Sequence, residues 1–96
     1  MQKILFRSTN RKADLVSFKA ALLKGQAPDY GLYMPEIIPK LTKQEIESFR
    51  KKEYHEIAFE IAKKFLQDEI EDAELKKLTK EAYNFDIPIE KVEDNI

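Results

Sequence analysis

The fold of this chain is decided by residues 24–35, KGQAPDYGLYMP, which contain both glycines and two of the four prolines. Gly25 follows an apolar run that ends in lysine, a position where helices commonly end on a left-handed residue. The order of residues in Pro28-Asp29-Tyr30-Gly31 is typical of a β-turn. Residues 32–34 leave room for a short strand before Pro35 stops it. The stretch therefore predicts the end of a helix, a turn and a strand in succession.

Length and composition bound the class of protein. With 96 residues there is room for one domain with a thin core, and 36% charged and 43% hydrophobic residues are typical of a globular chain. The 17 basic and 18 acidic residues are interleaved, which argues against a basic surface for nucleic acid or anionic lipid. The chain has no cysteine, which is compatible with the cytosol and excludes disulfides and thiolate chemistry. No apolar run approaches the length of a membrane span.

Short-range signals on the amino-terminal side predict one strand and one helix. Residues 3–8 are β-prone and can pair with residues 32–34. Ser17 is a good N-cap, and Phe18, Ala21 and Leu22 recur at the spacing of one helical face that would point inward.

The second half of the chain predicts three more helices. Thr42 and Glu45 form a capping box, and Leu41 and Ile46 are spaced as a hydrophobic staple across it, so a helix runs from there to about Arg50. A third helix over residues 53–67 has the strongest apolar periodicity and is expected to be the spine of the core. Its predicted inward stripe consists of Tyr54, Ile57, Ala58, Ile61, Phe65 and Leu66.

The last helix begins near Asp72, where acidic residues crowd the first turn and lysines follow, as the helix dipole favours. Leu75, Leu78 and Ala82 are its expected inward positions, and Asn84 is a plausible C-cap. Residues 87–92 are expected to be extended. The predicted fold class is α+β, mainly α, with about four helices and a short two-stranded β-ribbon.

Several segments resemble the amino-terminal domain of threonine synthases, the pyridoxal-phosphate enzymes that convert O-phosphohomoserine to threonine. They are spread over nearly the whole chain: Ser8-Thr9-Asn10 and residues 17–25 (SFKAALLKG), 27–29 (APD), 31–36 (GLYMPE), 54–59 (YHEIAF), 68–70 (DEI) and 93–96 (EDNI). Two positions depart from the family pattern. The family often has a glycine where Tyr30 stands and an arginine where Asn10 stands.

The resemblance implies that residues 1–96 are a single domain that packs on and caps the catalytic domains of a cytoplasmic threonine synthase, a lyase of threonine biosynthesis. In that family the cofactor lysine lies in a Phe-Lys-Asp segment preceded by Gly-Pro-Thr, and a glycine-rich loop binds the cofactor phosphate. Neither segment occurs in this sequence. We therefore expect a chain cut before the cofactor-binding domain, with no catalytic, cofactor-binding or metal-binding residue of its own.

The resemblance also implies the partners and the reaction of the complete enzyme. This domain would contact its own catalytic domains in cis, and the small-molecule substrate would be O-phosphohomoserine, with no nucleic acid and no membrane involved. Pyridoxal phosphate would be bound by the complete enzyme and not by this fragment. Phosphate is eliminated from the substrate, and water adds at Cβ to give threonine.

Three features look like sites but are better explained by structure. Ser17-Phe18-Lys19 resembles a cofactor-lysine motif, yet Lys19 lies on an amphipathic helix with no glycine-rich phosphate loop, so a surface lysine is favoured. His55 has no cysteine partners and flanks the apolar stripe, which favours a partly exposed polar residue over a metal ligand or general base. The carboxylates of residues 68–74 lack the glycine and the spacing of a calcium loop.

Residues 8–12 are the one segment for which a functional role competes with a structural one. The hydroxyls of Ser8 and Thr9, the amide of Asn10 and the cations of Arg11 and Lys12 could contact a phosphate-bearing ligand or the neighbouring domain at the active-site mouth. The alternative is a simple solvated loop.

Two further hypotheses of function stay open from the sequence. One is a stand-alone helical protein-interaction module, which an apolar patch left exposed on a monomer would favour. The other is a threonine-synthase-like phospho-lyase with a related phosphorylated amino acid as substrate, which nothing before Ile96 separates from threonine synthase.

Overall fold

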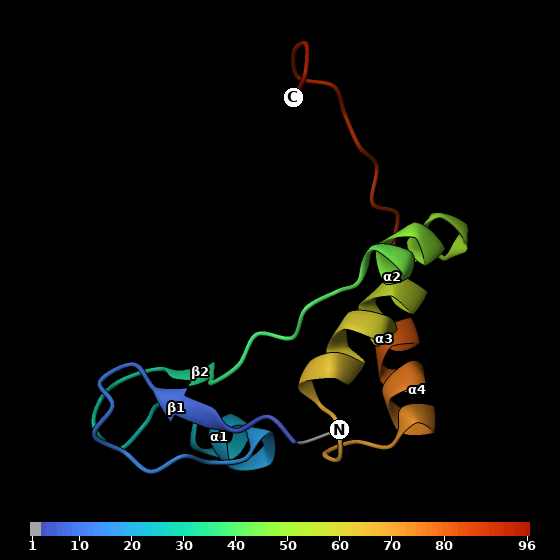
Figure 1. The fold of residues 1–96 in the computed structure, drawn as a ribbon. Helices are drawn as coiled ribbons and strands as arrows, with labels where there is room; N and C mark the ends of the chain where they lie inside the picture. The colour runs from blue at the N-terminus through green and yellow to red at the C-terminus, as the bar shows by residue number, and fades with distance from the viewer. Residues whose placement is uncertain (1–2) are drawn as a thin grey trace.

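A computed structural model describes residues 3–96 of the chain and contains the predicted four α-helices and two strands. In chain order the elements are β1 (Phe6–Ser8), α1 (Phe18–Lys24), β2 (Tyr33–Pro35), α2 (Lys43–Ser48), the 3₁₀ turn η1 (Phe49–Lys51), α3 (Tyr54–Phe65) and α4 (Asp72–Ala82). The α+β fold class with a two-stranded ribbon is confirmed. The elements form two lobes, an N-terminal lobe of residues 3–35 and a helical lobe of residues 43–82 (Figure 1).

The N-terminal lobe is built on the antiparallel pairing of β1 with β2, in which Arg7 lies opposite Met34. The segment that precedes α1 extends this ribbon, because Phe6 exchanges two backbone hydrogen bonds with Val16, of 2.8 and 3.0 Å. Behind the ribbon α1 completes a small core, whose buried members Ile4, Phe6 and Ala21 are packed by Val16, Phe18 and Tyr33.

Helix α1 begins and ends where the sequence predicts. The Ser17 side chain accepts a hydrogen bond from the Ala20 backbone N–H at 3.2 Å, and Gly25 closes the helix with φ of 75°. A positive φ is the conformation that a glycine adopts at little cost. The buried face of α1 differs from the predicted one at Leu22, which is exposed, whereas Ala21 is buried as predicted.

The predicted turn is present but closes one residue earlier than its composition suggests. The Tyr30 N–H donates to the Ala27 carbonyl at 3.0 Å, so the turn runs from Ala27 to Tyr30 with Pro28 in second place. Tyr30, not a glycine, then takes the left-handed conformation, with φ of 69°. This is the position where the family resemblance leads one to expect glycine.

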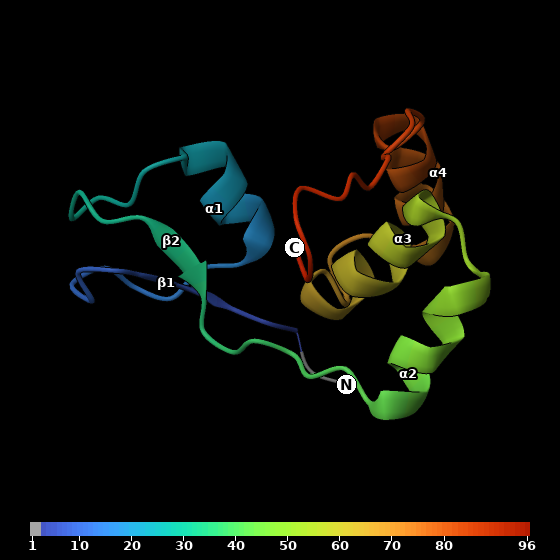
Figure 2. The same ribbon diagram turned by 90° about the horizontal axis from the view of Figure 1, so that it is seen from above.

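In the helical lobe α3 and α4 pack against each other and run in opposite directions (Figure 1), and α2 lies beside α3 (Figure 2). The predicted capping box of α2 is confirmed, with Thr42 and Glu45 each bonding the other's backbone N–H at 3.1 Å. The ion pair of Lys64 with Glu45, at 2.8 Å, joins α3 to α2. None of the helices in residues 3–96 is long and apolar enough to cross a bilayer.

The buried face of α3 is not the predicted stripe. Phe59 is the buried residue of this helix, and it packs towards α4, where Leu75 and Thr79 are buried. Tyr54 and Ile61 from the predicted stripe are exposed instead. The other four residues of the stripe are half-buried, namely Ile57, Ala58, Phe65 and Leu66. The prediction was therefore wrong in part, because periodicity identifies an apolar side of a helix but not which partner covers it. Phe59 lies outside the predicted stripe, and the Nζ atoms of Lys63 and Lys76 lie 5.8 and 5.3 Å from the centroid of its ring.

Four smaller predictions on the helices were also wrong. Ile46 of the expected staple is exposed, and so are Leu78 and Ala82 of the expected α4 core. The C-cap of α4 is Tyr83, whose N–H bonds the Thr79 carbonyl, and not Asn84. In each case the sequence had the residue type and spacing that favour the predicted role, but the folded chain does not place the residue in that role.

The polar contacts between the two lobes, within residues 3–96, converge on Glu69 in the loop between α3 and α4. Its carboxylate is almost buried, with 7% of the side chain exposed, and it accepts a 3.0 Å hydrogen bond from the Phe18 N–H at the start of α1. The same oxygen pairs with Lys3 Nζ at 3.2 Å. A carboxylate at a helix N-terminus is favoured by the unpaired N–H groups and by the dipole.

The chain exposes far more surface than a compact protein of its mass. Its accessible surface is 8026 Å², whereas roughly 5,700 Å² is typical for 11.3 kDa. The radius of gyration is 16.3 Å, against roughly 12.5 Å for a compact chain of this length. The separated lobes account for part of the excess, and the carboxyl-terminal tail, which extends away from both lobes beyond Phe85, accounts for another part (Figure 1).

Glu69→Ala should lower the free energy of unfolding by about 1.5–3 kcal/mol, because it removes a charged acceptor from the Phe18 N–H. Lys3→Met should cost only about 0–1 kcal/mol, because its ammonium is partly exposed. Urea unfolding of the 96-residue chain measures both, and Glu69→Gln, which keeps an acceptor without the charge, should fall between them. An equal cost for Glu69→Ala and Lys3→Met would show that the hydrogen bond to α1 does not join the lobes.

Candidate functional site

The predicted contact segment, residues 8–12, is held in one conformation by the carboxylate of Asp29. Asp29 Oδ1 accepts hydrogen bonds from Ser8 Oγ at 2.5 Å and from the Gly31 N–H at 3.0 Å. Asp29 Oδ2 accepts one from the Lys12 N–H at 2.9 Å. One side chain in the turn therefore fixes the loop that follows β1.

Two more of the predicted residues serve the same structure. Asn10 Nδ2 donates to the Asp29 carbonyl at 2.9 Å, and Thr9 Oγ1 accepts from the Leu32 N–H at 3.0 Å. The Thr9 N–H in turn bonds the Leu32 carbonyl at 2.9 Å. The polar groups of Ser8, Thr9 and Asn10 are thus engaged within the protein, and Ser8 is 1% exposed.

Arg11 and Lys12 differ from these three residues, because both are exposed. Arg11 adopts a left-handed backbone, with φ of 62°, at the tip of the loop. No ion pair within residues 3–96 involves either side chain. These two cations are the part of the predicted segment that remains available to a ligand.

Gly31 has a role that its place in the turn did not indicate. A Cβ atom at this position would lie 2.2 Å from Ser8 Oγ and 3.0 Å from the Asn10 nitrogen. Any larger residue would therefore push the β1 loop away from the turn. Gly31 is needed for close approach rather than for an unusual backbone angle.

The hydrogen bond from Ser8 is the main reason that the pKa of Asp29 lies below its usual value of 3.8. The N–H groups of Gly31 and Lys12 act in the same direction, because each stabilises the ionised form. A hollow of about 490 Å³ opens beside this loop, with Arg7 and Arg11 among its lining residues. Arg7 is paired with Glu36 at 2.9 Å. Glu36 also lines the hollow, so Arg11 is the lining cation that has no ion pair within residues 3–96.

The residues of this chain do not fit pyridoxal phosphate. Lys19 is exposed on α1, whereas a Schiff-base lysine lies in a pocket beside a phosphate anchor of backbone amides. Gly25 ends α1 and Gly31 abuts Ser8, so neither is available for such an anchor.

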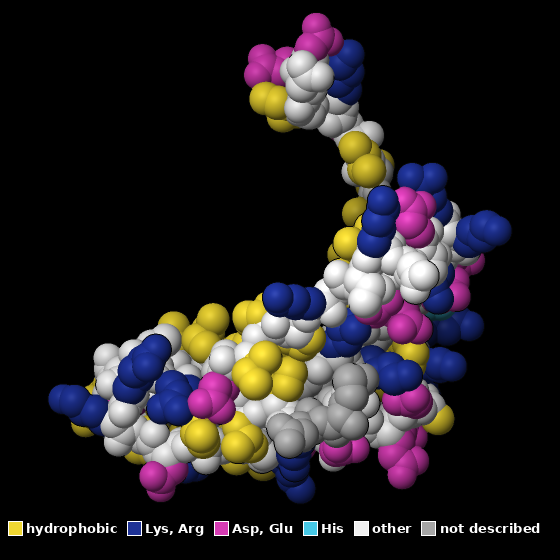
Figure 3. Space-filling model, in the orientation of Figure 1, with side chains coloured by type: hydrophobic (Ala, Val, Ile, Leu, Met, Phe, Trp, Pro, Cys, Tyr) yellow, Lys and Arg dark blue, Asp and Glu magenta, His cyan; other side chains and the backbone are white. Residues whose placement is uncertain are grey.

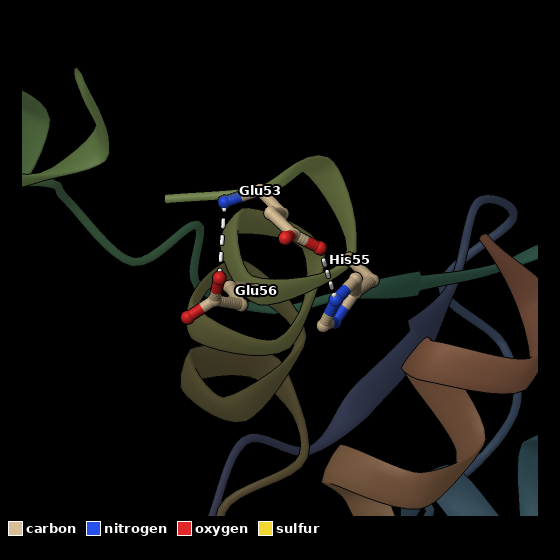
Figure 4. Close-up of side chains that lie close together, drawn as sticks. All are labelled: Glu53, His55 and Glu56. Atoms are coloured by element: carbon tan, nitrogen blue, oxygen red, sulfur yellow. Dashed lines mark hydrogen bonds and ion pairs between the residues drawn. The ribbon is translucent and has the colours of Figure 1, made fainter. Parts of the chain in front are cut away.

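His55 lies in a three-residue cluster with Glu53 and Glu56 whose ligand-type atoms all lie within 4.8 Å of one another (Figure 4). Helix capping accounts for the cluster. Glu56 Oε1 accepts from the Glu53 N–H at 3.1 Å, and the Glu56 N–H donates to the Glu53 backbone carbonyl at 3.0 Å. Glu53 Oε2 also meets His55 Nε2 at 2.9 Å. The carboxylates are therefore committed to the first turn of α3.

The acidic run of residues 68–74 likewise has a structural explanation. Glu69 bridges the lobes, Asp68 turns the chain with φ of 64°, and Asp72 pairs with Lys63 at 3.3 Å. Periodicity and composition gave no signal for the bridge from Glu69, because its partners are far away in the sequence.

The fold and its loop define a small α+β domain with a pre-formed polar loop and a large exposed surface. The sequence profile of the family described as "Threonine synthase N terminus" matches residues 5–83. The chain belongs to this family.

Two relatives that match most of the chain are named threonine synthase, and a third carries a related name. Threonine synthase of Pseudomonas aeruginosa is 42% identical over 76 residues, which are 79% of this chain and 16% of that protein. Threonine synthase of Schizosaccharomyces pombe is 39% identical over 83 residues, which are 85% of this chain and 16% of that protein. A rat protein named "Threonine synthase-like 2" is 38% identical over 61 residues, 64% of this chain and 13% of its own.

Two solved structures share the fold. Threonine synthase of Brucella melitensis with bound PLP superposes with a TM-score of 0.81 at 35% identity, over 85% of this chain and 18% of that one. Threonine synthase of Escherichia coli superposes with a TM-score of 0.86 at 25% identity, over 95% and 21%. The chain therefore spans about a fifth of the length of these proteins.

The lowered pKa of Asp29 predicts an acid-dependent loss of stability. A depressed folded-state pKa contributes stability that is present above the unfolded value and is lost as the pH falls through the folded value. Asp29→Asn should therefore melt at a lower temperature than the wild type at neutral pH, and the gap should close as the pH drops below 3.8. Thermal melts across this range, with the exposed Asp14→Asn as control, measure the effect. A gap that stays constant into acid would contradict the assignment.

Proposed function

We propose that this chain is the amino-terminal domain of a longer threonine synthase that converts O-phospho-L-homoserine and water to L-threonine and phosphate. The observation that carries the proposal is the match of residues 5–83 to the family's N-terminal segment, together with superposition on two threonine synthase structures. The relatives are about five times longer, so the domain would be followed by the cofactor-binding part of the same polypeptide.

The proposed role of the domain is to pack against the catalytic part of the same polypeptide. Its surface exceeds that of a compact protein by an amount larger than the roughly 800 Å² that one partner buries in a standard interface. Exposed apolar side chains occur on both lobes and along the tail, and Figure 3 shows them interspersed with charges on one face. When bound, pyridoxal phosphate supplies the electron sink for phosphate elimination, and the residues that hold it belong to the remainder of the chain.

Two predictions separate this function from its alternatives. The protein with its continuation should release phosphate from O-phosphohomoserine, and borohydride should fix the cofactor to a lysine outside residues 1–96. The 96-residue chain alone should do neither. An adduct at Lys19 would falsify the proposed division of labour.

A threonine-synthase-like phospho-lyase is the second candidate, because one relative carries the name "Threonine synthase-like 2". The same phosphate assay decides between the two. Release from another phosphorylated amino acid, with none from O-phosphohomoserine, would favour the second candidate.

We also propose that residues 8–12 lie at the entrance of the active site, with the roles divided as the hydrogen bonds suggest. Ser8, Thr9 and Asn10 hold the loop, and Arg11 and Lys12 present charge to the phosphorylated substrate. The double variant Arg11→Ala/Lys12→Ala of the longer protein should raise KM about tenfold with little change in kcat, the loss expected for one or two exposed charge contacts.

Lys40→Ala is the matched control for this double variant, because Lys40 is an exposed cation outside the loop. Substituting Ser8 or Thr9 would be a poorer test, since both support the fold of the loop. An unchanged KM in the double variant would show that the loop does not contact substrate.

A further inference from the structure

Three aromatic rings lie next to one another on the surface where α3 begins and α4 ends. The rings of Tyr54 and Tyr83 meet edge to face with centroids 5.3 Å apart, and Phe85 follows at 6.4 Å from Tyr83. Their exposed fractions are 50%, 38% and 61% respectively. We call these three residues the aromatic ladder.

The ladder has the composition of a binding anchor rather than of a core. Large aromatic side chains carry much of the free energy of protein interfaces, and rings already held against neighbours lose little conformational entropy when a partner covers them. A hollow of about 340 Å³ lies beside Tyr83 and Phe85, and its lining includes the charged Glu53, Lys80 and Asp86. An apolar centre with a charged rim is the usual anatomy of an interface.

The position of the ladder indicates its partner. Helix α4 ends at Ala82, so Tyr83 and Phe85 are the first residues of the tail that leaves the domain. The family match ends at residue 83, and the relatives are several times longer than this chain. A segment tethered next to a surface reaches it at a high effective concentration. The polypeptide that follows the tail is therefore the favoured occupant.

We propose that the aromatic ladder is the main anchor by which this domain docks against the cofactor-binding part of its own polypeptide. The inference rests on the proposed function, because it requires that such a part follows. It goes further in assigning the docking to one set of residues among the many exposed apolar side chains, including those of α1.

The test compares the 96-residue chain with the longer protein. Phe85→Ser should change the melting temperature of the 96-residue chain little, because Phe85 touches only the edge of the ladder. In the longer protein the same change should make proteolysis between domain and remainder roughly tenfold faster. Hydrogen exchange at residues 84–86 should be slow in the longer protein and fast in the 96-residue chain.

Leu23→Ser is the matched control, because Leu23 is an exposed apolar residue on α1 in the other lobe. It should leave both proteolysis and exchange at wild-type rates. Equal effects of Phe85→Ser and Leu23→Ser, or fast exchange at residues 84–86 in the longer protein, would overturn the assignment. So would a dimer of the 96-residue chain that Phe85→Ser abolishes, since the occupant would then be a second copy.

Phosphate release from O-phosphohomoserine, measured on the same samples, keeps the two proposals apart. Release without protection of the ladder would refute the docking assignment and leave the proposed function standing. Protection without release would refute the proposed function and support the docking surface.

Discussion

The arrangement of the two lobes depends on one carboxylate. Glu69 caps the exposed start of α1 from a loop 51 residues away, and Lys3 balances its charge. The two lobes otherwise pack mainly within themselves, each on a small core of its own. A small core within each lobe does not by itself fix the position of one lobe relative to the other. The bridge therefore lets a 96-residue chain present surfaces from both lobes in a fixed relation to a partner.

Within the N-terminal lobe, the carboxylate of Asp29 likewise joins two segments of the chain by accepting hydrogen bonds. By accepting hydrogen bonds from Ser8, Gly31 and Lys12 it draws the β1 loop against the turn, and Gly31 leaves the space for this approach. Both acidic residues thus satisfy backbone N–H groups that would otherwise lack partners. These two carboxylates therefore contribute to the stability of the domain alongside apolar burial.

Local signals in the sequence predicted the elements well, because capping acts over a few residues. Ser17, Gly25 and the Thr42–Glu45 box mark helix ends where the structure has them. The buried face of α3 was not predictable in the same way. Tyr54 belongs to the strongest apolar stripe of the sequence yet is half exposed, and it contributes to the surface that we assign to docking.

The candidate site was only partly predictable. The segment of residues 8–12 stood out by composition, but the division between loop-holding and exposed residues depends on Asp29, which the sequence presented as a turn residue. The bridge from Glu69 left no local pattern either, because its partners are distant in the chain. Contacts of this kind follow from tertiary structure, and propensity or periodicity does not encode them.

In the proposed enzyme, these residues pack against the catalytic part of the same polypeptide, and the reaction takes place beyond them. The most direct measurement is the sequence of the gene past the codon for Ile96. We expect the reading frame to continue through a Gly-Pro-Thr and Phe-Lys-Asp segment and then a glycine-rich loop. A stop codon directly after Ile96 would contradict it and would leave a binding module without a catalytic part of its own.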